Sequence, residues 1–167
     1  MNLYLLRHGI AVEPGTPGYE RDSERPLIPK GERRLHSAAA AMKKLGLSFD
    51  LILSSPFVRA RQTAEIMAEE LKLKKHIRFS DDLVPGGNAR ALIHALNELK
   101  PAPENLLLAG HEPNLSRLIS LLVSGGADAA IEMKKGGLCK LEIGELCHGR
   151  CAQLAWLLTP AQMEWMA

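Results

Sequence analysis

The stretch "LYLLRHGIAVE" (residues 3–13) begins as an apolar, strand-like run and then changes abruptly to Arg7, His8 and Gly9. Short apolar runs bounded by polar residues are typical of buried strands. In an open parallel sheet, ligands bind beyond the carboxyl ends of the strands. A cation, an imidazole and a glycine at such an end indicate one of two things. Either the strand simply reaches the surface there, or these residues hold an anion.

Length and composition predict one domain over residues 1–167, since 46% of the residues are hydrophobic and 24% are charged. A formal net charge of +2 without a dense basic block argues against a nucleic-acid partner. No apolar stretch approaches the ~18 residues that span a bilayer, so no membrane partner is expected. Arg7 interrupts the first apolar run too early for a signal peptide. We therefore expect a cytoplasmic protein.

The three cysteines, Cys139, Cys147 and Cys151, form an odd set that fits a reduced compartment better than a disulfide framework. The stretch "CHGRC" (residues 147–151) raises the alternative of a zinc site with His148 as a third ligand. Its spacing matches no common zinc pattern, and no second ligand pair lies nearby in the sequence. We interpret these residues as thiols around a turn.

Strand-like and helix-like patterns alternate along the chain. Strands are expected over 2–7, 50–55, 76–80, 105–110, 138–143 and 153–158. Helices are expected over 31–46, from the cap at Ser55 and Pro56 to about residue 71, over 88–99, and from about 113 to 125. This alternation predicts an α/β fold with a mostly parallel sheet and helices on both faces. A polar segment over 9–29 is too long for an ordinary connection.

Three of the predicted strands end next to residues that suit anions. The first strand is followed by Arg7, His8 and Gly9, the second by "SSPFVRARQTA" (residues 54–64), and the fourth by "GHEPN" (residues 110–114). The second segment places Arg59 and Arg61 near a helix start, and His111 follows the fourth strand directly. Guanidinium groups bind phosphate oxygens in a fork, and helix N-termini add unpaired N–H donors. The sequence thus predicts a phosphate site at one sheet edge.

The two histidines suggest chemistry in addition to binding. A neutral imidazole among arginines can attack phosphorus and form a covalent phosphohistidine that water then cleaves. The neighbouring cations favour the neutral imidazole and neutralise the phosphoryl oxygens. Each feature also has a purely structural interpretation: a histidine at a strand end, a solvated arginine, or a turn before a helix. Their joint placement at one edge favours the phosphate site.

Three blocks, "LYLLRHG", "LILSSPFVRARQTAE" and "LLAGHEPNLS", resemble the histidine phosphatase (phosphoglycerate mutase-like) superfamily in order and spacing. "RPLIPKGERR" and the closing "LAWLLTP" resemble its short SixA-type phosphohistidine phosphatase branch. The resemblance implies a three-layer α/β/α sandwich with one antiparallel strand, and neither metal nor cofactor. It implies that His8 is the nucleophile, that Arg7 and Arg59 bind the phosphoryl oxygens, and that His111 is the second pocket histidine. Gly9 would let the loop turn tightly against the phosphate.

Arg61 has no assured counterpart in the family, and we interpret it as helix surface or at most a contact at the rim. Many relatives carry an acid in a mid-chain insertion that protonates an alkoxide leaving group. Here the matching stretch, "FSDDLVPGGNARAL", is short. Asp81, Asp82 and Glu112 are the available acids, and for Asp82 and Glu112 we favour capping, turn formation or surface solvation over a catalytic role.

A missing acid suits P–N cleavage better than P–O cleavage, because imidazole leaves readily once its ring is protonated. The sequence therefore predicts a phosphohydrolase acting on the phosphohistidine of a protein, such as a phosphotransfer domain or a phosphocarrier. The alternatives are a small-molecule phosphomonoesterase of the same fold and a non-catalytic phosphate-binding module; a mutase fits least. The 9–29 segment, with Tyr19, Arg21 and Arg25, either flanks the pocket or serves only as a structural loop.

Overall fold

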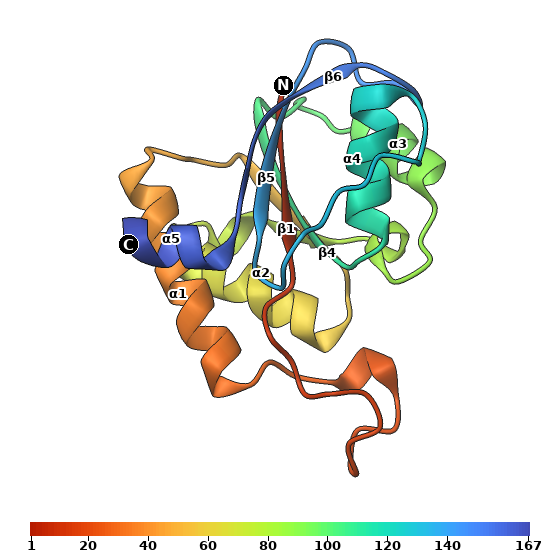
Figure 1. Cartoon of the computed structure of the whole chain (residues 1–167). Helices are drawn as coiled ribbons and strands as arrows, with labels where there is room; N and C mark the ends of the chain where they lie inside the picture. Colours follow the sequence, from red (N-terminus) through yellow and green to blue (C-terminus); the bar gives the residue numbers. More distant parts are fainter.

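The computed structural model describes all 167 residues and contains one six-stranded sheet in the order β3-β2-β4-β1-β5-β6 (Figure 1). The strands are β1 Asn2–Arg7, β2 Leu51–Ser54, β3 Ile77–Phe79, β4 Asn105–Gly110, β5 Leu138–Ile143 and β6 Ala152–Leu158. Pairing is parallel among β1, β2, β3 and β4, while β5 pairs antiparallel with both β1 and β6. Only β5 therefore runs against the others. The predicted mostly parallel α/β sheet with one reversed strand is confirmed.

Helices cover both faces of the sheet. They are α1 Pro29–Lys44, α2 Val58–Glu70, α3 Ala89–Asn97, α4 Asn114–Ser124 and α5 Pro160–Met166. Helices α1, α2 and α5 lie on one face and α3 and α4 on the other, as Figure 1 shows. This is the three-layer arrangement expected from the sequence. None of the helices has both the length and the apolar character that crossing a membrane requires.

Two cores, one on each face, follow from the alternation of side chains along the central strand. Leu3 and Leu5 of β1 are fully buried against α3 and α4. Tyr4 and Leu6 point the other way and are buried with side chains of α1 and α2. Because successive strand residues point to opposite faces, one apolar run supplies both cores. The double burial fixes the register of β1, and with it the position of the residues that follow its carboxyl end.

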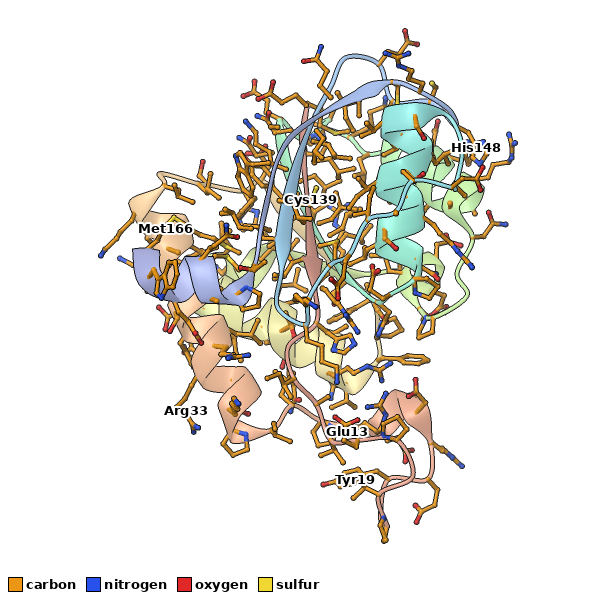
Figure 2. The ribbon with its side chains drawn as sticks, viewed as in Figure 1. Glu13, Tyr19, Arg33, Cys139, His148 and Met166 are labelled. Atoms are coloured by element: carbon orange, nitrogen blue, oxygen red, sulfur yellow. The ribbon has the colours of Figure 1, made fainter.

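The structure corrects the predicted end of the chain. The last strand was expected to close the fold, yet α5 follows it and packs Met163 into the core beneath α1. Thr159 begins this helix with a capping box: its side chain accepts the N–H of Gln162, whose own side chain accepts the N–H of Thr159. Pro160 occupies the first turn. Figure 2 shows Met166 at this end, near α1.

Candidate active site

The carboxyl ends of β1, β2 and β4 bring the predicted residues together. Arg7 pairs with Gly110 in the parallel register of β1 and β4, so His8 and His111 each come one residue beyond a strand end. The backbone continues this alignment past the strands, because the N–H of His8 donates to Gly110 O over 3.0 Å. The rings of His8 and His111 lie 5.0 Å apart, centroid to centroid. The predicted convergence at one sheet edge is therefore present in the fold.

His8 is buried, with 6% of its surface exposed, and its ring is held in one tautomer. Its Nδ1 lies 2.8 Å from Gly9 O. A carbonyl oxygen can only accept, so Nδ1 carries the proton and Nε2 carries the lone pair, which accepts a hydrogen bond from Arg59. Burial lowers the pKa of His8 to about 3, and repulsion from His111, Arg59 and Arg7 adds to this shift. A neutral ring with a lone pair on Nε2 is the form in which imidazole acts as a nucleophile.

His111 is also buried, and its Nε2 lies 2.9 Å from the hydroxyl of Ser55. That hydroxyl accepts the backbone N–H of Phe57 and is free to donate its own proton to Nε2. When the hydroxyl donates to Nε2, the proton of the neutral ring is on Nδ1, a buried atom without a hydrogen-bond partner. Burial lowers the pKa of His111 to about 3, and Arg59 is the strongest of the nearby charges acting in the same direction. The site thus holds a neutral imidazole with an unused donor.

The two arginines supply positive charge to this pair of rings. Arg59 is 3% exposed, and its Nε donates to Nε2 of His8 over 3.2 Å. Arg7 is half-buried and donates from one terminal nitrogen to the carbonyl of Met133 over 2.7 Å, while its buried Nε has no partner. The guanidinium of Arg59 also lies 5.4 Å from the ring centre of Phe57. The cation against the lone pair of His8, together with the nearby charge of Arg7, suits an incoming group that carries negative oxygens.

Thr63 is a site residue that the sequence analysis missed. It is fully buried on α2, accepts the N–H of Gly9 over 3.1 Å, and donates to the carbonyl of Arg59 over 2.7 Å. One hydroxyl therefore ties the loop after β1 to the helix that carries Arg59. Its only signal in the sequence is its place four residues after Arg59 on a predicted helix.

The sequence analysis expected glycine at position 9 to allow a tight turn against the phosphate, but the structure shows another reason for glycine there. A Cβ atom at this position would lie 2.8 Å from Leu35 Cδ1 and 3.2 Å from Leu27 Cδ2. Both backbone polar groups of Gly9 are engaged, the N–H with Thr63 and the carbonyl with His8. A side chain at this position would thus press on Leu35 of α1 and on Leu27, so close packing favours glycine here. A direct contact of Gly9 with phosphate remains a prediction.

Ser55 also differs from its expected role as a helix cap. The first residue before α2 is Phe57, which makes no side-chain cap. Ser55 is fully buried, and its hydroxyl joins the N–H of Phe57 to His111 instead. The residue therefore positions the second histidine.

The segment between β1 and α1 projects from the carboxyl edge of the sheet, and Figure 2 shows Glu13 and Tyr19 on it. A short 3-10 turn over Asp22–Glu24 brings the segment back to the site. Asp22 accepts hydrogen bonds from Arg25 on one carboxylate oxygen and from Arg59 on the other. Partial burial would raise the pKa of Asp22, but the hydrogen bonds from Arg25 and Arg59 outweigh it and hold the pKa below its usual value. Arg21 remains exposed and pairs with Glu24.

The remaining candidates lie away from the two rings or have other partners. Arg61 is on the exposed face of α2, where it pairs with Glu65 over 3.8 Å. Glu112 accepts the N–H of Ser116 over 3.0 Å in the first turn of α4. Asp81 is exposed, and Asp82 lies half-buried in a short 3-10 turn after β3. These contacts agree with surface and capping roles, while any catalytic role of Asp82 or Glu112 remains a prediction.

The cysteines lie apart from the histidine pair. Cys139 is buried in β5, and burial raises the pKa of its thiol to about 12. Cys147 is exposed and Cys151 half-buried in the connection between β5 and β6, where Cys151 Sγ lies 3.5 Å from Cys147 O. Figure 2 shows His148 of this connection at the end of the molecule opposite Tyr19. No group of three or more metal-ligating side chains lies together in the fold, so the zinc interpretation of "CHGRC" gains no support.

Comparisons with known proteins identify the family of this fold. A family model described as the histidine phosphatase superfamily (branch 1) matches residues 3–84. An uncharacterised protein from Picosynechococcus is 39% identical over 145 residues, which are 86% of each chain. The chain therefore belongs to the histidine phosphatase superfamily.

Two further comparisons involve SixA proteins. The phosphohistidine phosphatase SixA of Escherichia coli is 28% identical over 126 residues, which cover 75% of this chain and 76% of SixA. The solved structure of the protein histidine phosphatase SixA complexed with tungstate has a TM-score of 0.82 at 24% identity. That match covers 98% of this chain and 99% of the other. The fold is thus that of a SixA-like protein over nearly its whole length.

Proposed function

We propose that this protein is a phosphohydrolase that removes the phosphoryl group from the phosphohistidine of a protein through a phosphohistidine on His8. The observation that carries the proposal is the His8 ring itself. Its proton is held on Nδ1 by Gly9 O, and its Nε2 lone pair lies against the guanidinium of Arg59. A non-catalytic binding module would have no use for a neutral, oriented nucleophile at this place.

In the first step, Nε2 of His8 attacks phosphorus, and the bond between phosphorus and the substrate imidazole breaks. The electron pair of that bond stays on the substrate nitrogen, and the substrate ring, already protonated on its other nitrogen, leaves as neutral imidazole. Arg7 and Arg59 neutralise the phosphoryl oxygens, and Nδ1–H of His111 donates to one of them. The two buried atoms without partners, Arg7 Nε and His111 Nδ1, fit this demand. In the second step, water attacks phosphorus, the P–N bond breaks with its electron pair returning to Nε2 of His8, and inorganic phosphate leaves carrying both protons of the water.

The state of the nearby acids supports a phosphohistidine substrate over a phosphomonoester. An alkoxide leaving group needs a protonated acid beside it. Asp22 is paired with two arginines and its pKa lies below the usual value, so it is ionised at neutral pH. Glu112 is engaged with the backbone of α4. An imidazole leaving group requires no such acid, and the name of the SixA relative points to the same substrate class.

The partner in this proposal is a protein that carries phosphohistidine, either a phosphotransfer domain or a phosphocarrier. We place the activity in the cytoplasm, where Cys139, Cys147 and Cys151 stay reduced. The test compares kcat/KM for a phosphohistidine protein, a phosphoserine peptide and an activated aryl phosphate. We expect phosphohistidine to exceed phosphoserine by at least about 10²-fold, the usual contribution of a general acid that phosphoserine would need. Equal values for the two would contradict the proposal and favour a phosphomonoesterase.

A further inference from the structure

Asp22 binds the same nitrogens of Arg59 that a phosphoryl group would need. One terminal nitrogen of Arg59 donates to the backbone carbonyl of Asp22 over 2.7 Å, and the other donates to its carboxylate over 2.9 Å. The third nitrogen, Nε, donates to His8. Every nitrogen of the guanidinium therefore has a partner. Each terminal nitrogen carries a second N–H, but the two N–H groups that face Asp22 become available to phosphoryl oxygens only when Asp22 is replaced.

We propose that the substrate displaces Asp22 from Arg59. In the free protein Asp22 occupies the phosphoryl-binding side of Arg59 and holds the 9–29 segment against it, until a phosphoryl group takes its place. The proposal rests on the proposed function, since it assigns phosphoryl binding to Arg59. It adds a residue that sets the affinity of the pocket for oxyanions. Asp22 offers Arg59 two oxygens, one from its backbone carbonyl and one from its carboxylate, as two phosphoryl oxygens would, which makes Asp22 a direct competitor.

The exposure of the two partners supports an exchange of anions. The side chain of Arg59 is 4% exposed, so its charge is costly without a counter-charge. The side chain of Asp22 is 51% exposed and can return to water at little cost. A doubly charged phosphoryl group offers Arg59 more charge than the single charge of Asp22. The buried cation stays paired throughout, and only the exposed partner changes.

Arg25 is the second arginine that binds Asp22. Its side chain is 10% exposed, and it donates from Nε and one terminal nitrogen to Oδ1 of Asp22, the oxygen that Arg59 does not use. Its other terminal nitrogen donates to the carbonyl of Val12. Asp22 can therefore leave Arg59 and remain paired with Arg25. The 3-10 turn that carries the carbonyl and the carboxylate of Asp22 moves away from Arg59, and the charge of Asp22 stays paired with Arg25.

A simple orienting role for Asp22 makes the opposite prediction. If Asp22 only held Arg59 in place, removing its charge would weaken oxyanion binding. If Asp22 competes, removing its charge must strengthen that binding. Asp22→Asn separates the two, because asparagine keeps the shape and the backbone carbonyl of the residue but is a much weaker partner for guanidinium.

The experiment is titration calorimetry of the full chain with inorganic phosphate. We expect Asp22→Asn to bind phosphate about tenfold more tightly. This is the gain expected if Asp22 occupies Arg59 in about nine-tenths of the unsubstituted molecules and the substitution abolishes that state. Glu24→Gln is the matched control, because it removes one negative charge from the same 3-10 turn at a residue that pairs only with Arg21. Unchanged or weaker binding by Asp22→Asn would overturn the displacement.

Hydrogen exchange of residues 12–25 gives a second readout. We expect phosphate to speed exchange in this segment of the unsubstituted chain and to leave it unchanged in Asp22→Asn. Slower exchange with phosphate would overturn the proposal, since it would mean that the segment closes over the ligand. Phosphate binding is measured without turnover. If phosphate binds as predicted but phosphohistidine is not cleaved, only the proposed function fails.

Discussion

Arg59 donates its Nε–H to Nε2 of His8 over 3.2 Å, so the proposed nucleophilic nitrogen lies in contact with the proposed phosphoryl-binding cation. The contact joins residues 51 positions apart in the sequence, one after β1 and the other in the first turn of α2. It fixes which nitrogen of His8 faces the incoming phosphorus. The predictions below test this pair and the groups that hold it in place.

Arg59→Lys keeps a positive charge but loses the planar fork that contacts both His8 and Asp22. We expect kcat/KM for a phosphohistidine protein to fall by about 10²-fold, the loss typical of a charge-stabilising donor. Arg61→Lys is the matched control, since Arg61 lies two residues further along α2 on the exposed face. A similar loss in both variants would assign the effect to the helix rather than to the pocket.

Thr63→Val replaces the buried hydroxyl with a methyl group of the same shape. The N–H of Gly9 loses its acceptor, and the link to the carbonyl of Arg59 is lost with it. We expect the free energy of unfolding to fall by about 1–3 kcal/mol, the cost of an unsatisfied buried donor. Urea denaturation measures this change. Thr63→Ser keeps the hydroxyl and should recover most of the stability; a valine variant as stable as the parent would contradict the linking role.

The free energy of unfolding should depend on pH through the two buried histidines. Burial lowers the pKa of His8 and of His111 from 6.5 to about 3 in the folded chain. Between these values the unfolded chain binds more protons, so the histidines favour folding above about pH 6.5 and this contribution is lost as the pH falls toward 3. Each can contribute a slope of at most about 1.4 kcal/mol per pH unit.

Denaturant unfolding between pH 7.5 and 4.5 measures this dependence. His111→Gln should make the slope shallower, because it removes one of the two titrating rings. His148→Gln, which changes an exposed histidine at the far end of the molecule, should leave the slope as it is. Equal slopes in all three proteins would show that the His111 ring does not titrate as described.

Asp82→Asn and Glu112→Gln test whether the site works without a general acid. Asp82 lies in a turn after β3 and Glu112 caps the first turn of α4. We expect kcat for phosphohistidine to stay within about twofold in each variant, far less than the 10²-fold typical of losing a general acid. The release of inorganic phosphate measures kcat in each variant. A loss of that larger size in either variant would identify the acid and return phosphomonoesters to consideration.

The fold and the central residues of the site could be predicted because their signals are local. Apolar runs mark β1, β2 and β4, and His8, Arg59 and His111 follow these strands at short distances in the sequence. Parallel pairing then brings the strand ends to one edge. Knowledge of the sheet was sufficient to place these side chains together.

The parts that could not be predicted depend on how irregular segments run in space. Asp22 meets Arg59 across 37 positions of sequence through a segment without periodicity. Ser55 carries the signal of a helix cap, yet packing beside His111 gives it another partner. Helix α5 is seven residues long, too short for a helical period to stand out, although Thr159 and Gln162 mark its start.

The most direct test of the central claim is to trap the phosphorylated enzyme. The protein is mixed with a ³²P-labelled phosphohistidine protein, quenched in alkali within the first turnover, and digested for peptide mapping. We predict base-stable, acid-labile label on the peptide that contains His8, and none in His8→Asn. Label on another residue, or rapid release of phosphate by His8→Asn, would contradict the assignment of His8 as the nucleophile.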